Sequence, residues 1–449
     1  MNTVIKSIAK LPNILYNVYI EEIHMENINY KKRIADSQVE EYLKLFGAVC
    51  IEGPKYCGKT WLGRKHAKSE TLLQKKEGEK SNEVELAKIS PKLVLEGEKP
   101  RLIDEWQEAT NLWDEIRIDV DRSGLKGQYI LTGSSTPKRD NISHSGAGRY
   151  GKIYLRTMSL YESGDSSGLV SLKDICDGKK IEVSTGEVDL RHLASLIIRG
   201  GWPANLNLTS SESKKVVNEY LNLIINDDLY RLDGANRDKH KMRLLLKSLA
   251  RNESTTASNS TIKNDINEVD NEDIDMNTLS SYLNALDKLF LLDNDEPFST
   301  NIRSSVRVKQ AEKRHFADPS IAAALLNLSE EKLINDLETF GLLFEALVER
   351  DLKVYAESMG AKTYHYQDYL NREIDQIIEL EDGDWCAFEI KLGANQIDSA
   401  ASNLLKIRDG IKENNGKTPK VLCIICGMTS AAYQRPDGVF VVPITALRN

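Results

Sequence analysis

The segment that decides the fold of the first half of this chain is Gly53-Pro54-Lys55-Tyr56-Cys57-Gly58-Lys59-Thr60. It satisfies the phosphate-loop pattern GxxxxGK[ST], it follows the apolar run 48–51, and it precedes a segment with helical spacing. In such a loop the backbone amides and the helix N-terminus point donors at a phosphate, and the lysine reaches the outer phosphates. We therefore predict a strand–loop–helix unit whose residues 53–60 bind ATP, with Thr60 reaching Mg²⁺.

A short apolar strand downstream is expected to supply the acids of the same site. Leu102-Ile103 is followed directly by Asp104 and Glu105. A carboxylate at a strand end can hold the water shell of Mg²⁺, and a second one can orient the attacking water. We predict that Asp104 binds the metal and that Glu105 is catalytic.

Further polar residues follow the apolar run 129–131. Thr132 and Ser134 supply hydroxyls at a strand end, where we expect them to sense the γ-phosphate. Arg149, which follows Gly146-Ala147-Gly148, is a candidate arginine finger for a transferring phosphoryl group. The alternative is a surface or packing role, because charged side chains are usually solvated.

A second charged constellation lies near the C-terminus. Asp375 and the pair Glu389 and Lys391 flank Asp382-Gly383-Asp384, which is typical of a hairpin turn. Residues two apart on a strand share a face, so Glu389 and Lys391 should point together with Asp375 opposite them. Glu345, on an upstream helical segment, is expected to lie near the same site.

Two carboxylates beside a lysine suit metal-dependent cleavage of a phosphodiester. Mg²⁺ prefers oxygen ligands, and the lysine can steady or activate a water molecule. We predict that Asp375 and Glu389 bind a divalent cation and that these two, Lys391 and Glu345 are catalytic. One alternative is an exposed strand face with alternating charges. Another is a nuclease-like fold that binds without cutting.

The composition limits the class of protein. The chain has 449 residues, enough for two to four domains, and its net charge of −8 means that nucleic acid would need a local basic patch. No window approaches the ~20 apolar residues of a membrane span. The six cysteines are scattered, which suits a reducing compartment, and Cys423 and Cys426 lie in an apolar run that favours packing over metal binding. We expect a cytoplasmic protein without membrane contact.

Alternation of strand and helix patterns divides the chain into four expected parts. Residues 1–45 should form an N-terminal helical segment, 46–190 a P-loop ATPase domain, 191–318 a helical lid and winged-helix region, and 319–449 a nuclease-like domain. The stretch 162–186 is rich in Gly, Ser, Asp and Lys and is expected to be a loop or an excursion between modules.

The winged helix is expected at about 240–300, with the apolar helix 276–292 packing a small core. Acidic residues crowd the start of that helix and would repel phosphate, which favours a lid or a protein-docking module over DNA contact. These acids are Asp270, Glu272, Asp273 and Asp275.

Taken together, the pattern resembles a bacterial and archaeal ATPase family in which an AAA+-type domain precedes a winged-helix region and a PD-(D/E)XK nuclease-like domain. The resemblance implies an α/β multidomain fold: an AAA+-type P-loop NTPase domain, a helical and winged-helix middle, and a C-terminal α/β restriction-endonuclease-like domain. The chain departs from the family at Arg156-Thr157-Met158, where prolines are usual. The segments that carry the resemblance are Tyr30-Lys31-Lys32-Arg33-Ile34-Ala35-Asp36, 53–60, 102–105, Leu131-Thr132-Gly133-Ser134, Gly148-Arg149, 155–162, Gly200-Gly201-Trp202-Pro203, Lys313-Arg314-His315-Phe316-Ala317-Asp318-Pro319 and Glu389-Ile390-Lys391.

Two classes of function follow from these residues. The first is an Mg²⁺-dependent ATPase coupled to a DNA-acting, nuclease-like domain, which Asp375, Glu389 and Lys391 favour. The second is a nucleotide-dependent switch that binds DNA or protein without cleavage, which the acidic net charge favours. ATP is the expected ligand in both, and DNA, a second copy of the chain or another protein are the partners left open.

Overall fold

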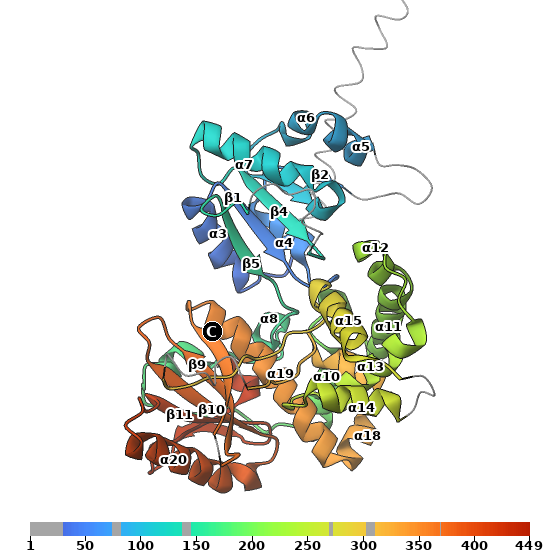
Figure 1. The fold of residues 1–449 in the computed structure, drawn as a ribbon. Coiled ribbons are helices and arrows are strands. Elements are labelled where there is room, and N and C mark those ends of the chain that lie inside the picture. Colours follow the sequence, from blue (N-terminus) through green and yellow to red (C-terminus); the bar gives the residue numbers. More distant parts are fainter. Residues whose placement is uncertain (1–29, 74–81, 137–144, 269–272, 302–309, 369) are drawn as a thin grey trace, which may run out of the picture. The chain divides into compact units, whose positions relative to one another are not determined.

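The computed structural model describes residues 30–73, 82–136, 145–268, 273–301, 310–368 and 370–449. The chain divides into two compact units, 1–33 and 34–449, and all elements named below belong to the second (Figure 1). Of the predicted N-terminal helical segment, residues 1–29 lie outside the described residues, and α3 (Ala35–Leu45) forms its end.

The first sheet has five parallel strands in the order β2-β3-β4-β1-β5. Helix α7 packs on one face through Leu112 and Ile116, and α4 lies on the other, where Gly63 approaches Leu102 and Thr132. A parallel sheet covered on both faces explains the near-continuous apolar runs of its strands. The strands are β1 (Ala48–Glu52), β2 (Ser69–Leu72), β3 (Arg101–Asp104), β4 (Tyr129–Gly133) and β5 (Tyr150–Tyr154), and the helices are α4 (Lys59–His66), α5 (Asn82–Ile89), α6 (Pro91–Leu95), η1 (Trp106–Ala109) and α7 (Asn111–Ser123).

This strand order brings the carboxyl ends of β1, β3 and β4 together at one edge of the sheet. Ile51 on β1 pairs with Thr132 on β4, and Ile103 on β3 pairs with Leu131. The loop after β1 and the polar residues after β3 and β4 therefore meet at the place where open α/β sheets bind ligands.

The second sheet has seven strands in the order β7-β12-β13-β11-β10-β9-β8. Alternate residues of β11 face opposite layers: Cys423 packs in the core that contains α19, and Ile424 packs against α20. Strands β10, β11 and β13 are parallel, and the remaining pairs are antiparallel. The elements are β8 (Lys362–Gln367), β9 (Glu373–Glu379), β10 (Trp385–Lys391), β11 (Val421–Cys426), β12 (Ala431–Gln434), β13 (Phe440–Pro443), α19 (Leu337–Glu357) and α20 (Ile397–Glu413).

Of the two alternatives predicted for 162–186, a loop or an excursion between modules, the loop is wrong. This stretch carries α8 (Leu160–Ser163), β6 (Val170–Ser171), α9 (Leu172–Cys176) and β7 (Glu182–Ser184), with β6 pairing with β14 (Leu447–Arg448) and β7 with β12. Edge strands this short are held by backbone hydrogen bonds, so their polar side chains do not exclude pairing. Strand β7 thus joins the C-terminal sheet, and β6 forms a separate two-stranded sheet with β14, although the predicted boundary of the ATPase domain lies after both, at residue 190.

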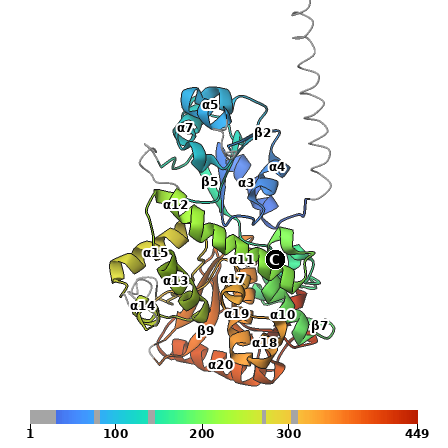
Figure 2. The same ribbon diagram turned by 90° about the vertical axis from the view of Figure 1, so that its right-hand side faces the viewer.

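Along the chain, the residues between β7 and β8 lie mostly in helices. Figure 2 shows α10, α11, α13 and α17 among them. Asp275, one of the acids expected to crowd the third helix of the predicted winged helix, is its N-cap and accepts from the amides of Asn277 and Thr278 at 2.8 and 2.9 Å. Asp270 and Glu272 lie outside the described residues. The helices are α10 (Leu190–Arg199), α11 (Ser210–Leu223), η4 (Ile224–Asp228), α12 (Leu229–Asp233), α13 (Lys239–Arg251), α14 (Asn259–Asn267), α15 (Met276–Lys288), α17 (Pro319–Leu325) and α18 (Glu330–Asn335).

The segment after α15 returns as a short antiparallel pair of isolated bridges. Leu292 is opposite Phe316, and Asp295 is opposite Lys313. This pair delivers the segment 313–316 to the side of α19, where Lys313 contacts Glu345 and Glu349.

The turn at Arg156-Thr157-Met158 is built without the prolines that the resemblance would lead one to expect. Arg156 pairs with Asp293 at 2.7 Å, and the Thr157 hydroxyl donates to Asp318 at 2.7 Å. The amide of Met158 donates to the carbonyl of Gly201 at 2.7 Å. Side-chain and backbone hydrogen bonds therefore fix this turn.

All six cysteines are free and buried. Cys423 and Cys426 lie in the interior of β11, and within the described ranges neither belongs to a group of residues that could hold a metal ion. A search of the same ranges finds no helix that is both long enough and apolar enough to cross a membrane.

The close approach at Gly201 predicts a stability effect. A Cβ atom there would lie 2.2 Å from the carbonyl oxygen of Met158, which is backbone and cannot swing away. We expect Gly201→Ala to destabilise the protein by ~1–3 kcal/mol, the usual cost of overpacking. Chemical denaturation monitored by circular dichroism would measure it.

Gly341 is the matched control because it lies in α19 with no atom within 4 Å of an added Cβ. Gly341→Ala should be neutral or stabilising by up to ~1 kcal/mol through helix propensity. Equal unfolding midpoints for the Gly201 and Gly341 variants would contradict the packing argument.

Candidate functional site

The phosphate loop connects β1 to α4 with the backbone that its glycines permit. Gly53 has φ +151° and Gly58 has φ +102°, both in the region that favours glycine. A side chain at Gly53 would also meet the carbonyl oxygen of Leu155 at 2.2 Å. The loop therefore lies directly against the end of β5, and the Cys57 thiol donates to the same carbonyl at 3.2 Å.

The side chain of Lys59 folds back over the loop. Its Nζ donates to the carbonyl oxygens of Gly53 and Pro54 at 3.0 and 2.7 Å, and the residue is buried. A second lysine of the loop, Lys55, pairs with Asp228 of η4 at 2.6 Å. The two lysines are thus held by different partners before any phosphate is bound.

Asp104 lies at the centre of the predicted nucleotide site. Its Oδ1 accepts hydrogen bonds from the hydroxyls of Thr60 at 2.8 Å and Thr132 at 2.5 Å. Its Oδ2 is buried and has no hydrogen-bond partner. Burial raises the pKa of Asp104, and the hydrogen bonds from Thr132 and Thr60 oppose that rise.

Glu105 is held in place by a second pair of side chains. It takes a left-handed backbone conformation with φ +57°, and its carboxylate accepts from the Ser134 hydroxyl at 2.8 Å and from the Gln107 amide. Its own amide donates to Thr132 at 3.2 Å. The structure therefore brings Thr60, Asp104, Glu105, Thr132 and Ser134 together. Gln107 was missed because an amide in a short 3-10 helix carries no motif signal.

Arg149 lies at the amino end of the same sheet, opposite the end that carries the phosphate loop. It precedes β5, whose first residue Tyr150 pairs with Ala48 at the start of β1, while the phosphate loop follows the end of β1. Five strand residues span roughly 15 Å. Arg149 Nε pairs instead with Asp121 at 2.7 Å, with 46% of the arginine side chain exposed. An arginine-finger role would therefore require the nucleotide of another subunit.

The C-terminal charged residues also come together. The register of β9 and β10 pairs Gln376 with Phe388, which places Asp375 opposite Glu389 one residue on. Lys391 Nζ lies 3.1 Å from Asp375 Oδ2 and 3.0 Å from Glu389 Oε1. The amide of Ile390 donates to Asp375 Oδ2 at 2.7 Å, which fixes the carboxylate at the point where the two strands separate.

Glu345 joins this group through a lysine that sequence reasoning missed. Lys313 forms an ion pair with Glu345, lies 2.8 Å from Glu349, and donates to the backbone carbonyl of Asp375 at 3.3 Å. Lys313 opens the sequence Lys313-Arg314-His315, and Glu345 and Glu349 are four residues apart on one face of α19. That spacing was a usable signal for Glu349, whereas the contact with Lys313 depends on tertiary structure.

The lysines at this site do not fully offset the effect of burial on the carboxyl groups of Glu389 and Glu345. Burial, and then the charge of Asp375, raise the pKa of Glu389 to about 8. Burial likewise raises the pKa of Glu345 to about 8, although the Lys313 ammonium acts in the opposite direction. Glu389 Oε2 is buried with no hydrogen-bond partner. These properties are typical of carboxylates that accept a cation.

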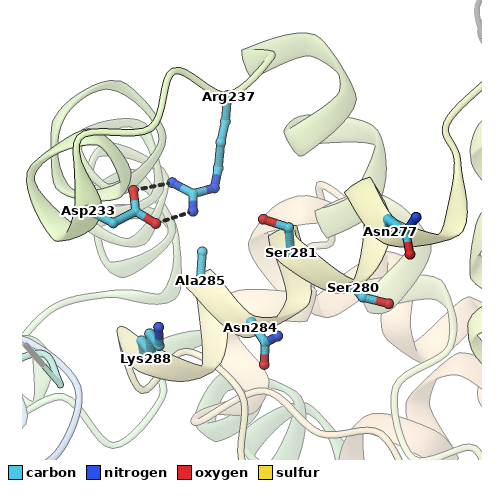
Figure 3. A pocket seen from close by; sticks show the side chains of 8 residues that line it. All are labelled: Asp233, Arg237, Asn277, Ser280, Ser281, Asn284, Ala285 and Lys288. Carbon is cyan, nitrogen blue, oxygen red and sulfur yellow. Dashed lines mark hydrogen bonds and ion pairs between the residues drawn. The ribbon is translucent and has the colours of Figure 1, made fainter. Parts of the chain in front are cut away.

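A polar hollow of about 340 Å³ lies between α12 and α15 (Figure 3). Arg237 forms two hydrogen bonds with Asp233 at its edge, at 2.9 and 2.5 Å. Asn277, Ser281 and Lys288 add further polar lining. None of the predicted nucleotide or nuclease-like residues lines it, so this hollow is separate from both sites.

Comparison with protein families finds matches for three segments of the chain. Residues 46–163 match the family described as "AAA domain". Residues 190–332 and 340–447 match two domains of unknown function, DUF8612 and DUF4143. With the five-stranded parallel sheet and the phosphate loop described above, residues 46–163 are a P-loop NTPase domain of AAA type.

Curated relatives and solved structures resemble the chain at low identity. Uncharacterized proteins of Mycobacterium bovis and Mycobacterium tuberculosis are each 23% identical over 365 residues, which cover 80% of this chain and 74% of theirs. A Walker-type ATPase of Pyrococcus abyssi is 15% identical with TM-score 0.41, over 66% of this chain and 96% of that one. AMPPCP-bound DnaA of Aquifex aeolicus is 13% identical with TM-score 0.26, over 58% and 89%. At TM-scores this low the structural likenesses do not bear on function.

Proposed function

We propose that this protein is an Mg²⁺-dependent ATPase coupled to a nuclease-like, DNA-acting C-terminal domain. The observation that carries the proposal is the cluster of Thr60, Asp104 and Glu105 beside the phosphate loop. These groups lie at the carboxyl edge of one parallel sheet, where a nucleotide and its metal ion need them.

The residues at this edge fit a nucleotide with Mg²⁺. Thr60 and the unpartnered Oδ2 of Asp104 would hold the metal ion directly or through its waters. Lys59 would exchange the carbonyls of Gly53 and Pro54 for phosphate oxygens. Bound Mg²⁺ would supply charge neutralisation at the phosphates.

Glu105 is the group proposed to activate water. Gln107 and Ser134 hold its carboxylate, so the base is oriented before the substrate arrives. Thr132 donates a hydrogen bond to Asp104, and Ser134 donates one to Glu105. A γ-phosphate that contacts either hydroxyl would therefore affect the position of the acid bonded to it.

The second half of the proposal rests on Asp375, Glu389 and Lys391. The unpartnered Glu389 Oε2 and the carboxylate of Asp375 would hold a divalent cation, with Lys391 within 3.1 Å of both acids to position water. We further propose that α13, α14, α15 and the bridges at Leu292 and Asp295 form a winged helix.

A second candidate function is a nucleotide-dependent switch that binds DNA or protein without cutting. The contact that favours it is the ammonium of Lys313 on Glu345, since an internal cation bound to this acid competes with a metal ion at the nuclease-like site. In this alternative the nuclease-like fold is retained for binding alone.

The nucleotide site predicts that Lys59→Ala lowers ATP affinity at least ~10-fold, because it removes the charge that neutralises the outer phosphates. Isothermal titration calorimetry with ATP and Mg²⁺ measures it. Lys65→Ala is the control, since Lys65 is exposed on the same helix and should bind like the parent. Unchanged affinity in the Lys59 variant would remove the assignment.

The acid pair predicts that Glu105→Gln keeps ATP binding but slows hydrolysis by ~10²-fold or more, because the amide retains the shape and loses the base. Steady-state phosphate release measures turnover. Glu108→Gln, in the 3-10 helix that follows Glu105, should leave turnover unchanged. Parent-like turnover in the Glu105 variant would show that another group activates the water.

The C-terminal site predicts that Asp375→Asn and Lys391→Met each abolish Mg²⁺-dependent cleavage of plasmid DNA while ATP hydrolysis continues, because the two sites lie on different sheets. Asp382→Asn, in the exposed hairpin turn, is the control. If the parent protein binds DNA but leaves it intact with Mg²⁺ and ATP, the switch replaces the nuclease as the proposed function.

A further inference from the structure

A second cluster of possible metal ligands lies behind the nuclease-like site. Asp295 comes from the bridge segment after α15, His315 from the segment opposite it, and Glu349 from α19. Each offers one ligand atom, and the three atoms all lie within 4.8 Å of one another. His315 Nε2 is 2.7 Å from Glu349 Oε2 and 3.7 Å from Asp295 Oδ2.

The three facing atoms are buried and poorly satisfied. Asp295, His315 and Glu349 are 2%, 4% and 1% exposed. None of the atoms Oδ2, Nε2 and Oε2 makes a hydrogen bond of acceptable geometry, although the imidazole and Glu349 approach closely. Among the described residues, Asp295 Oδ2 has no hydrogen-bond donor, and His315 Nε2 lies 3.7 Å from it. Buried polar atoms of this kind are costly unless a partner is present.

The opposite sides of the three residues are already fixed by other groups. His315 Nδ1 lies 3.3 Å from Glu253, which also accepts from the amide of Phe316 at 3.1 Å. Asp295 Oδ1 pairs with Lys353 at 3.1 Å, and Glu349 Oε1 pairs with Lys313 at 2.8 Å. Partners of this kind orient metal ligands and fix the histidine tautomer, which leaves the unsatisfied atoms aimed at a common point.

The surroundings of Asp295, His315 and Glu349 are rich in carboxyl groups, which favours the binding of a cation. The carboxyl groups outnumber the lysine, arginine and histidine side chains in the connected network, so acidic groups are in excess in the interior. A protein resolves such an excess by protonation or by binding a cation. The acids are Glu253, Asp293, Asp295, Glu345, Glu349, Glu357, Asp375 and Glu389, and the basic groups are Arg156, Lys313, His315, Lys353 and Lys391.

We propose that Asp295, His315 and Glu349 bind a divalent transition-metal ion. One imidazole with two carboxylates suits Zn²⁺, Mn²⁺ or Co²⁺, whereas Mg²⁺ favours oxygen ligands alone. The ion would join the bridge pair to α19 and so fasten the middle region to the C-terminal domain. This role is independent of the proposed hydrolysis of ATP and cleavage of DNA.

The test uses the full-length protein without an affinity tag, stripped with EDTA and titrated with Co²⁺ in excess Mg²⁺. We expect one Co²⁺ per chain, followed by its visible absorption bands. His315→Gln and Asp295→Asn should each weaken Co²⁺ binding at least ~10-fold, as expected for loss of a ligand. His192→Gln, at an exposed histidine, should bind like the parent.

Asp375→Asn separates this site from the nuclease-like site. It should retain the Co²⁺ site, and its loss of Co²⁺ binding would overturn the proposal by placing the ion at Asp375. Absence of Co²⁺ binding by the parent protein, or parent-like affinity in both ligand variants, would also overturn it. If the ligand variants fail to fold, X-ray absorption of the Zn²⁺-loaded parent decides: a shell of nitrogen and oxygen with one imidazole supports the site, and sulfur ligation refutes it.

Discussion

Helix α19 buries a run of charged side chains, and the rest of the C-terminal half is arranged to supply their partners. A buried charge without a partner is strongly destabilising, so each one must be matched. Arg350 pairs with Asp318 at 3.1 Å and with its neighbour Asp351, whose carboxylate also accepts from the amide of Leu160 at 2.9 Å. Lys353 pairs with Asp295 at 3.1 Å. The partners outside α19 come from three separate stretches of chain, at Leu160, Asp295 and Asp318, so the helix fixes all three at once.

The P-loop domain contacts the same network of buried charges through the turn after β5. Leu155 supports the phosphate loop through its carbonyl, and the next residue, Arg156, pairs with Asp293. Asp293 in turn lies 3.6 Å from Lys353 of α19. A displacement of the phosphate loop would therefore also displace Leu155, whose neighbour Arg156 is held by its ion pair with Asp293. Polar side chains thus replace the rigidity that prolines would give this turn.

The sequence predicted best where the determinants are local. The phosphate loop and the acids after β3 are contiguous motifs, and the face shared by Glu389 and Lys391 follows from strand periodicity alone. The pairing of β7 with the C-terminal sheet and of β6 with β14 escaped prediction because backbone hydrogen bonds to strands about 250 residues away leave no trace in nearby side chains. The position of Arg149 at the amino end of β5 could not be predicted, because closeness to glycines in sequence does not say at which end of a sheet a residue lies. Lys313 and His315 depend on tertiary contacts in the same way.

Because all six cysteines are buried, the accessibility of their thiols can report local unfolding. Cys50 and Cys57 belong to β1 and the phosphate loop, and the other four lie at 176, 386, 423 and 426. Burial raises the pKa of the Cys50 and Cys423 thiols, which keeps them unreactive in the closed state. A thiol reagent can therefore modify them only during transient openings, and the sites modified identify the part of the chain that opened. The unaltered chain thus reports local unfolding of its two sheets separately, without any engineered label.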